Sequence, residues 1–291
     1  MMKKRNIVCT LAILLLAVLF YSRTCTSASQ PRYCNNVQAT LHFLSSYDVD
    51  DIGRDSTTPV KEQDRDFVFS VFEDISKLYD VEKNRPNIAH FHPHDNITSQ
   101  YSKGCIYIDF LSYVNIEDAK GGIAHELIHY LTDNGQFTGF RYTLNDTYIF
   151  GQSLSEGVTN YFSTKYAPNP TYQYETHVAK LVSICYGEEK LKNDFFSTNV
   201  SNLRNDFNNS LKKHYPNQTY DSLTLTPFDL MTSVLNTYSD STDDSVQETQ
   251  MLAVEEMFLY YAKSKGYESE VKEEISNFAT GNNFDFLIQL L

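Results

Sequence analysis

Apolar residues recur at helical spacing along much of this chain, and the pattern predicts most of its secondary structure. Phe67, Val71, Ile75 and Leu78 follow one another at intervals of three or four residues, which predicts an amphipathic helix over residues 64–78. The hydrophobic pattern also predicts helices over residues 36–46, 155–166, 174–186, 188–196, 227–238, 246–265 and 269–278. The second half of the chain is therefore expected to be mainly helical.

Two short apolar runs predict β-strands, over residues 86–91 and 105–110. In the second run, Ile106 and Ile108 alternate with less apolar neighbours. Residues 48–63 and 138–151 are expected to form loops or irregular strand. Strands that precede a long helical region predict an α+β fold. We expect a small α/β lobe over residues 29–135 and a mainly helical lobe over residues 136–291.

The first residues have the pattern of a secretory signal peptide. Lys3, Lys4 and Arg5 precede an apolar stretch over residues 7–20, and small residues follow up to Ala28. The stretch is shorter than the about 20 residues that a membrane-spanning helix needs. We therefore expect a signal peptide over residues 1–28 and a secreted or extracytoplasmic protein. An uncleaved N-terminal anchor is the alternative.

The net charge argues against two classes of partner, and the cysteines argue against one kind of metal site. The formal net charge is −13, which argues against nucleic acids and anionic membrane surfaces. Removal of the signal peptide would leave Cys34, Cys105 and Cys185, whose spacing predicts no cysteine zinc site. The sequence leaves the oligomeric state open.

The most informative motif is His-Glu-Leu-Ile-His at residues 125–129, inside a helical pattern. Residues four apart lie on one face of a helix, so His125 and His129 can direct two imidazole nitrogens at one zinc ion. Glu126 lies beside them, where it can accept the proton of a zinc-activated water and pass it to a leaving amine. A chance match is the alternative. The motif predicts zinc-dependent hydrolysis of a peptide or protein substrate.

Zinc bound by two histidines needs a third protein ligand. Glu156 is the best candidate, at the start of the helix predicted over residues 155–166; an ordinary first-turn glutamate is the alternative. A metzincin would place His or Asp six residues after His129, at the position of Gly135. The predicted metal site is therefore His125, His129 and Glu156, at the junction of the two lobes.

Three segments together resemble the gluzincin metallopeptidases, most of all the peptidase domain of bacterial collagenases. Gly-Cys-Ile-Tyr-Ile-Asp at residues 104–109 is similar to that family's Gly-Gly-Ile-Tyr-Ile-Glu edge strand. Residues 125–131 are similar to its His-Glu-x-x-His-Tyr-Leu helix, and Glu-Gly at 156–157 with Tyr-Phe at 161–162 to its third-ligand helix. The resemblance covers residues 86–165. Plant-type basic secretory proteins share a similar pattern.

The resemblance implies a zincin-like (thermolysin-like) fold with zinc bound by His125, His129 and Glu156. It implies Glu126 as general base and residues 104–110 as the edge strand that pairs with an extended substrate. The collagenases carry a large helical activator module ahead of the peptidase domain, for which this chain has no room, so cleavage of triple-helical collagen is not expected.

Gluzincins also use a Tyr or His to stabilise the oxyanion of the reaction. Tyr174 and His177 are the residues that we expect in this role, and Tyr172 is a further candidate. A packing role is the alternative for each tyrosine, because the chain contains 21 of them.

Two positions depart from the family pattern. Cys105 replaces a glycine of the edge strand, and Asn160 stands where gluzincins usually have a carboxylate that accepts the second N–H of a ligand histidine. These departures keep a second hypothesis open, that of a catalytically weak or inactive pseudopeptidase that binds peptides or proteins.

A second cluster of histidines precedes the strand over residues 105–110. His90 and His92 would share one face of a strand, and His94 follows them. Together they suggest a second metal site; a solvated strand end is the alternative.

Overall fold

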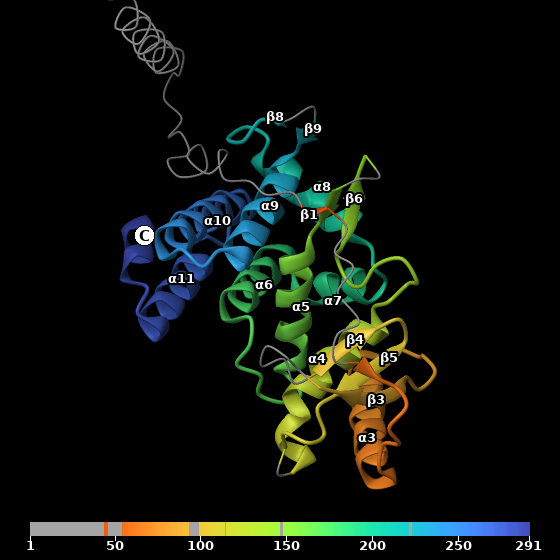
Figure 1. Cartoon of the computed structure of the whole chain (residues 1–291). Coiled ribbons are helices and arrows are strands. Elements are labelled where there is room, and N and C mark those ends of the chain that lie inside the picture. Colours follow the sequence, from red (N-terminus) through yellow and green to blue (C-terminus); the bar gives the residue numbers. More distant parts are fainter. Residues whose placement is uncertain (1–43, 46–53, 93–98, 114, 146–147, 221–222) are drawn as a thin grey trace, which may run out of the picture. The chain divides into compact units, whose positions relative to one another are not determined.

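The computed structural model describes residues 44–45, 54–92, 99–113, 115–145, 148–220 and 223–291 (Figure 1). The predicted signal peptide lies outside these residues. So does the helix predicted over residues 36–46, except Leu44–Ser45, which form the strand β1 instead. The backbone of β1 pairs with that of β7 (Tyr148–Phe150), so the helix prediction is wrong for these two residues. Within the described residues, none of the helices has the length and apolarity to cross a membrane.

A four-stranded sheet forms the first structural layer, in the order β2 (Arg54–Asp55), β3 (Asn87–Phe91), β5 (Cys105–Ile108) and β4 (Ser99–Ser102). The central pair, β3 and β5, is parallel, and the two outer strands run antiparallel to their neighbours. The strands β3 and β5 confirm two sequence predictions. The fold is α+β, as expected.

The edge of this sheet is not the strand that the resemblance implied. Because β5 is paired on both sides, the edges of this sheet are β4, next to β5, and β2. The sequence of β4, Ser-Gln-Tyr-Ser, has no apolar alternation and gave no strand signal. The hairpin that creates it turns at Lys103 and Gly104, both with positive φ, as two-residue hairpin loops require.

Two helices cover one face of the sheet. α3 (Glu62–Tyr79) confirms the helix predicted over residues 64–78, and α4 (Lys120–Leu131) carries the His-Glu-x-x-His motif. Asn115 begins this segment by accepting a hydrogen bond from the Glu117 N–H, and a 3₁₀ turn, η2 (Ile116–Ala119), leads into α4. The helices and strands share a core in which these side chains are buried: Val68, Val71, Ile75, Ile106, Ile108, Ile123, Leu127 and Ile128.

The C-terminal end of α4 is held by hydrogen bonds to the loop between α3 and β3 and to the edge strand β4. The Lys83 ammonium donates to the carbonyls of Tyr130, at 2.5 Å, and Asp133, at 2.7 Å. The Tyr130 hydroxyl donates to Asn84 O, and the Tyr101 hydroxyl donates to the Asp133 carboxylate. A cation at the last carbonyls of a helix is favourable both as a hydrogen-bond donor and against the helix dipole.

Helices make up most of the remaining chain. α5 (Gln152–Ser163) contacts α4, α6 (Gln173–Tyr186) and α9 (Pro227–Asp240). The other helices are α7 (Glu188–Phe196), α8 (Val200–Leu211), α10 (Asp244–Lys265), α11 (Glu268–Asn282) and the 3₁₀ turn η3 (Asp285–Leu290). In this region six predicted helices are found, and each end lies within three residues of its prediction except the C-terminal end of α11, which lies four residues later. The helix α8 was not predicted.

Short strands interrupt this helical region. β6 (Tyr142–Leu144) and β7 form a hairpin within the predicted loop over residues 138–151, and β8 (Gln218–Tyr220) pairs with β9 (Leu223–Leu225). The described elements all belong to one compact unit, Arg32–Leu291, and α4 contacts both the sheet and α5. The lobe boundary at residue 135 stays a prediction.

Candidate metal site

The motif on α4 places two histidines in the protein interior. His125 and His129 are 4% and 6% exposed, and their Nε2 atoms lie 3.1 Å apart. The apolar residues on the rest of the helix surface explain this burial, because they anchor α4 against α3 and the sheet. Two imidazole nitrogens this close together on a buried helix face can both bind one cation.

Glu156 completes this cluster from the first turns of α5. Its Oε2 atom lies 3.1 Å from His125 Nε2 and 2.9 Å from His129 Nε2. A tetrahedral zinc ion with bonds of about 2.0–2.2 Å holds its ligand atoms roughly 3.3–3.6 Å apart. The three atoms therefore match a metal site after small movements, and these residues could hold a metal ion, as the sequence predicted.

The cluster is electrostatically coupled. Burial opposes ionisation of Glu156, but His129, His125 and Arg141 outweigh it and hold the pKa of Glu156 well below its usual value. Burial also disfavours a charged His125, yet Glu156 and Glu126 outweigh it and raise the pKa of His125. A negative carboxylate facing two imidazoles is the charge arrangement that a divalent cation would stabilise.

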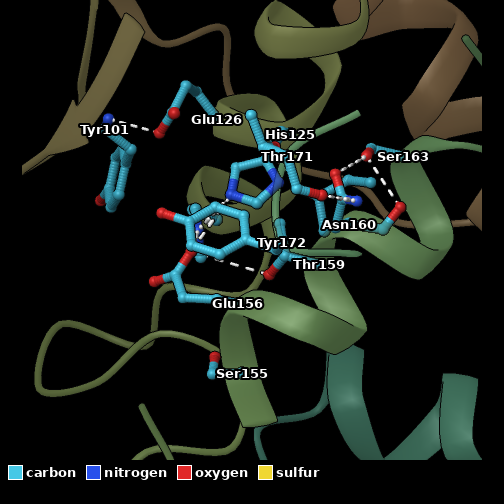
Figure 2. Close-up of polar contacts among 12 residues, drawn as sticks. Tyr101, His125, Glu126, Ser155, Glu156, Thr159, Asn160, Ser163, Thr171 and Tyr172 are labelled. Atoms are coloured by element: carbon cyan, nitrogen blue, oxygen red, sulfur yellow. Dashed lines mark hydrogen bonds and ion pairs between the residues drawn. The ribbon is translucent and has the colours of Figure 1, made fainter. Parts of the chain in front are cut away.

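Glu126 lies beside this cluster and is not part of it. Its Oε2 accepts a hydrogen bond of 2.7 Å from the Tyr101 backbone N–H of the edge strand β4 (Figure 2). Its Oε1 lies 3.5 Å from the Ser99 hydroxyl, on the same strand. Glu126 is thus held between the three candidate metal ligands, called the metal-binding cluster below, and the edge strand β4.

Asn160 lies one turn beyond Glu156 on α5 and is 1% exposed. Its Nδ2 donates to Thr171 O and Thr176 Oγ1, both at 2.8 Å. Asn160 also favours the protonated form of His125, although the buried Nδ1 of that ring has no hydrogen bond of normal geometry to a described residue. Asn160 therefore lies near the candidate ligand His125, but the expected contact is not formed as a hydrogen bond of normal geometry. The Asn160 amide also fixes the loop before α6.

Replacing Asn160 with Asp is expected to raise zinc affinity about 10–100-fold, because a carboxylate accepts the His125 N–H more strongly than an amide does. The same change removes the two donors to Thr171 and Thr176, so stability should fall by about 1–3 kcal/mol. Chelator competition and urea unfolding measure the two effects separately. Unchanged zinc affinity in the folded variant would contradict the proposed contact.

The structure corrects the expected oxyanion-stabilising residues. Tyr174 and His177 point away from the metal-binding cluster into the helical core: the Tyr174 hydroxyl donates to Met251 O, and His177 contacts Glu255 and Glu274. Helical periodicity explains the error, because Tyr174 and His177 are one turn apart on the buried face of α6. Neither residue contacts the site.

Tyr172 lies at the site instead. Its ring stacks on the His125 ring, with 5.4 Å between centroids and 14° between planes (Figure 2). The residue is 42% exposed and precedes α6 with φ of 51°. The charge of Glu156 first, then burial and Glu126, raise the pKa of Tyr172, so its hydroxyl stays a hydrogen-bond donor at neutral pH.

The glycine that follows the third ligand has a packing role. A Cβ on Gly157 would lie 2.1 Å from the backbone oxygen of Glu175 on α6. Only glycine allows α5 and α6 to approach this closely. The Glu-Gly pair of the motif therefore combines a candidate ligand with the contact that brings the Tyr172 loop to the site.

Arg141 is the site residue that sequence reasoning missed. It belongs to the segment between α4 and β6, and its Nη2 lies 2.7 Å from Glu156 Oε1. That segment was expected to be irregular, and a single arginine 15 positions from its partner leaves no periodic or motif signal.

Two further expectations concern residues away from the cluster. His90 Nε2 lies 3.4 Å from Pro59 O and His92 pairs with Asp55 at 3.6 Å, while His94 is outside the described residues. In the part of the chain that the structure describes, only His125, His129 and Glu156 group as metal ligands. Cys105 does not crowd a substrate edge, because β5 is internal to the sheet.

A polar hollow of about 560 Å³ lies between α7 and α8, away from the metal-binding cluster. Exposed asparagines such as Asn193, Asn205 and Asn209 line it, as expected for a solvated groove. None of the predicted site residues lines this hollow, so it adds nothing to the chemistry of the cluster.

In comparisons with known proteins, no family model, curated protein or solved structure matches this chain.

Proposed function

We propose that this protein is a secreted zinc-dependent peptidase with a zincin-like fold of the gluzincin type. The observation that carries the proposal is the convergence of His125 Nε2, His129 Nε2 and Glu156 Oε2 to within 2.9–3.1 Å of one another. Two imidazoles and one carboxylate are the ligand set of many catalytic zinc sites, in which a fourth position stays open. The donor chemistry and the spacing both fit zinc.

Each neighbouring side chain has a role in the proposed reaction. Bound zinc would act as a Lewis acid that polarises the scissile carbonyl and activates a water. Glu126 takes the proton from the attacking water and passes it to the leaving amine. Tyr172 donates a hydrogen bond to the developing oxyanion. The edge strand β4 binds the substrate backbone as an added strand.

The first experiment measures metal content and cleavage on the purified chain. We expect one zinc per chain, cleavage of unfolded casein with zinc present, and loss of cleavage after chelation that zinc restores. Failure to bind zinc would refute the proposal. Zinc binding at one equivalent without cleavage of any protein or peptide would favour the pseudopeptidase, a peptide-binding protein on the same fold.

Replacing Tyr172 with Phe tests the proposed oxyanion donor. Removing one such donor typically lowers kcat about 10²–10³-fold, and we expect a loss in this range with zinc affinity unchanged. Steady-state kinetics and chelator competition provide the two readouts. Tyr174→Phe is the matched control: it removes a buried hydroxyl two residues away and should leave kcat near that of the wild type. Equal kcat values in both variants would exclude Tyr172 from the reaction.

A further inference from the structure

The two oxygens of Glu156 have different partners. Oε2 faces His125 and His129, whereas Oε1 accepts a hydrogen bond of 2.7 Å from Arg141 Nη2. The Glu156 side chain is 13% exposed and that of Arg141 is 30% exposed. Hydrogen bonds between a guanidinium and a carboxylate that are partly shielded from water are among the stronger ones in proteins. Rotation of the carboxylate would break this bond.

The chain holds Arg141 in place through the start of α5. The Ser155 hydroxyl, next to Glu156, donates to Thr138 O at 3.1 Å. Gly139 approaches Ser155 so closely that a Cβ there would lie 2.4 Å from Ser155 Oγ. The Arg141 N–H in turn donates to Thr138 O at 3.4 Å. The segment that carries Arg141 is thus packed against the turn that carries Glu156, and this packing keeps the two side chains next to each other.

A carboxylate can bind a metal ion through one oxygen or through both. We propose that Arg141 is a positioning residue that restricts Glu156 to binding zinc through Oε2 alone. The proposal rests on the zinc site proposed above. With Oε1 retained by Arg141, the protein supplies three donor atoms, and the ion keeps an open position for water and substrate. Arginine suits this role because its guanidinium stays charged at every physiological pH.

The alternative is that the Arg141–Glu156 pair only stabilises the fold. The chain offers a matched control for this alternative in Arg204, whose Nη2 lies 2.7 Å from Asp229 Oδ2 and whose side chain is 29% exposed. Asp229 accepts other hydrogen bonds at the start of α9 and is absent from the metal-binding cluster. Loss of either arginine removes a similar ion pair, but only one of the two pairs includes a predicted ligand.

The test uses Co²⁺ in place of zinc, because the visible absorption of Co²⁺ weakens severalfold when its coordination number rises above four. We expect Co²⁺ in the wild type, in Arg204→Met and in Arg141→Lys to give the strong four-coordinate spectrum. Co²⁺ in Arg141→Met should absorb severalfold more weakly, because Glu156 gains a second metal–oxygen bond. The same spectrum in Arg141→Met as in the wild type would overturn the proposal.

A crystal structure of the zinc-loaded wild type decides the question even if Arg141→Met does not fold. We expect Oε2 at about 2.0–2.2 Å from zinc and Oε1 still on Arg141. Both oxygens within bonding distance would overturn the inference while leaving the peptidase proposal intact. If neither metal binds the wild type, the proposed zinc function fails first, and the role of Arg141 fails with it.

Discussion

The variant Glu126→Gln is expected to retain its fold and its zinc but to lose proteolysis. Gln has nearly the size of Glu and can still accept the Tyr101 N–H, so the strand contact that holds residue 126 remains. It cannot take a proton from water or return one to the leaving amine. General acid–base catalysis contributes about 10²–10⁴-fold, and we expect the loss in kcat at or above the upper end, because this residue also orients the water.

Two other variants make the result interpretable. Glu73→Gln makes the same chemical change at an exposed residue paired with Arg85, and should keep full activity. His125→Ala should lose zinc as well as activity, unlike Glu126→Gln. Steady-state kinetics on unfolded protein and zinc content per chain distinguish these outcomes. A zinc-loaded Glu126→Gln protein that kept most of its activity would show that the metallopeptidase mechanism is wrong.

His177→Leu is expected to destabilise the fold by about 3–5 kcal/mol, the usual effect of removing one partner of a buried ion pair. His177 Nε2 lies 3.1 Å from Glu255 Oε1, an ion pair rather than a well-aligned hydrogen bond. The side chains of His177 and Glu255 are 1% and 0% exposed. The variant would leave the Glu255 carboxylate buried without its cation. Urea unfolding measures the loss.

The stabilisation that His177 provides should decrease as pH rises. Burial disfavours a charged His177, but Glu255 on α10 and Glu274 on α11 outweigh it and raise the pKa of His177. When folding raises the pKa of a group, protonation of that group stabilises the folded state. The full stabilisation is present below the pKa in the unfolded chain, about 6.5 for His. It is lost as pH rises through the higher pKa of the folded state. The difference between wild type and His177→Leu should therefore shrink at alkaline pH.

Two control variants distinguish the buried pair of His177 and Glu255 from the neighbouring ion pair of Lys180 and Glu274. Lys180→Met removes an ion pair to Glu274 from a side chain that is 52% exposed, and should cost at most about 1 kcal/mol. The double variant His177→Leu/Glu255→Leu replaces the pair by apolar side chains and should recover most of the lost stability. A small effect of His177→Leu near pH 6 would mean that His177 carries no charge in the native protein.

The parts of the site that the sequence could predict depend on local spacing. The four-residue interval between His125 and His129 determines a shared helix face wherever a helix forms. Glu156 is at the start of a second helix, and the contact of α5 with α4 brings it to the histidines, as the motif order implied. Long helices such as α10 were predicted because apolar residues recur over several turns.

The missing parts depend on contacts between distant segments or on single backbone angles. The edge strand β4 is polar and owes its place to a hairpin turn at Lys103 and Gly104. Tyr172 reaches His125 because its φ is positive, a conformation that a non-glycine residue rarely adopts and that no periodicity indicates. Arg141 meets Glu156 only once the segment after α4 has folded against α5.

The hydrogen bonds that Lys83 and Tyr101 make at the end of α4 bear on how the proposed metal ion could enter and leave its site. These bonds satisfy the Tyr130 carbonyl in the last turn of the helix and tie Asp133, just beyond it, to the edge strand without using any residue of the metal-binding cluster. The segments of a protein that open most easily are those with few buried contacts and exposed backbone hydrogen bonds. α4 is the opposite kind of segment, so its amide hydrogens should exchange slowly with solvent in the metal-free protein too. An ion bound at the proposed site could then leave and return while the helix stays folded.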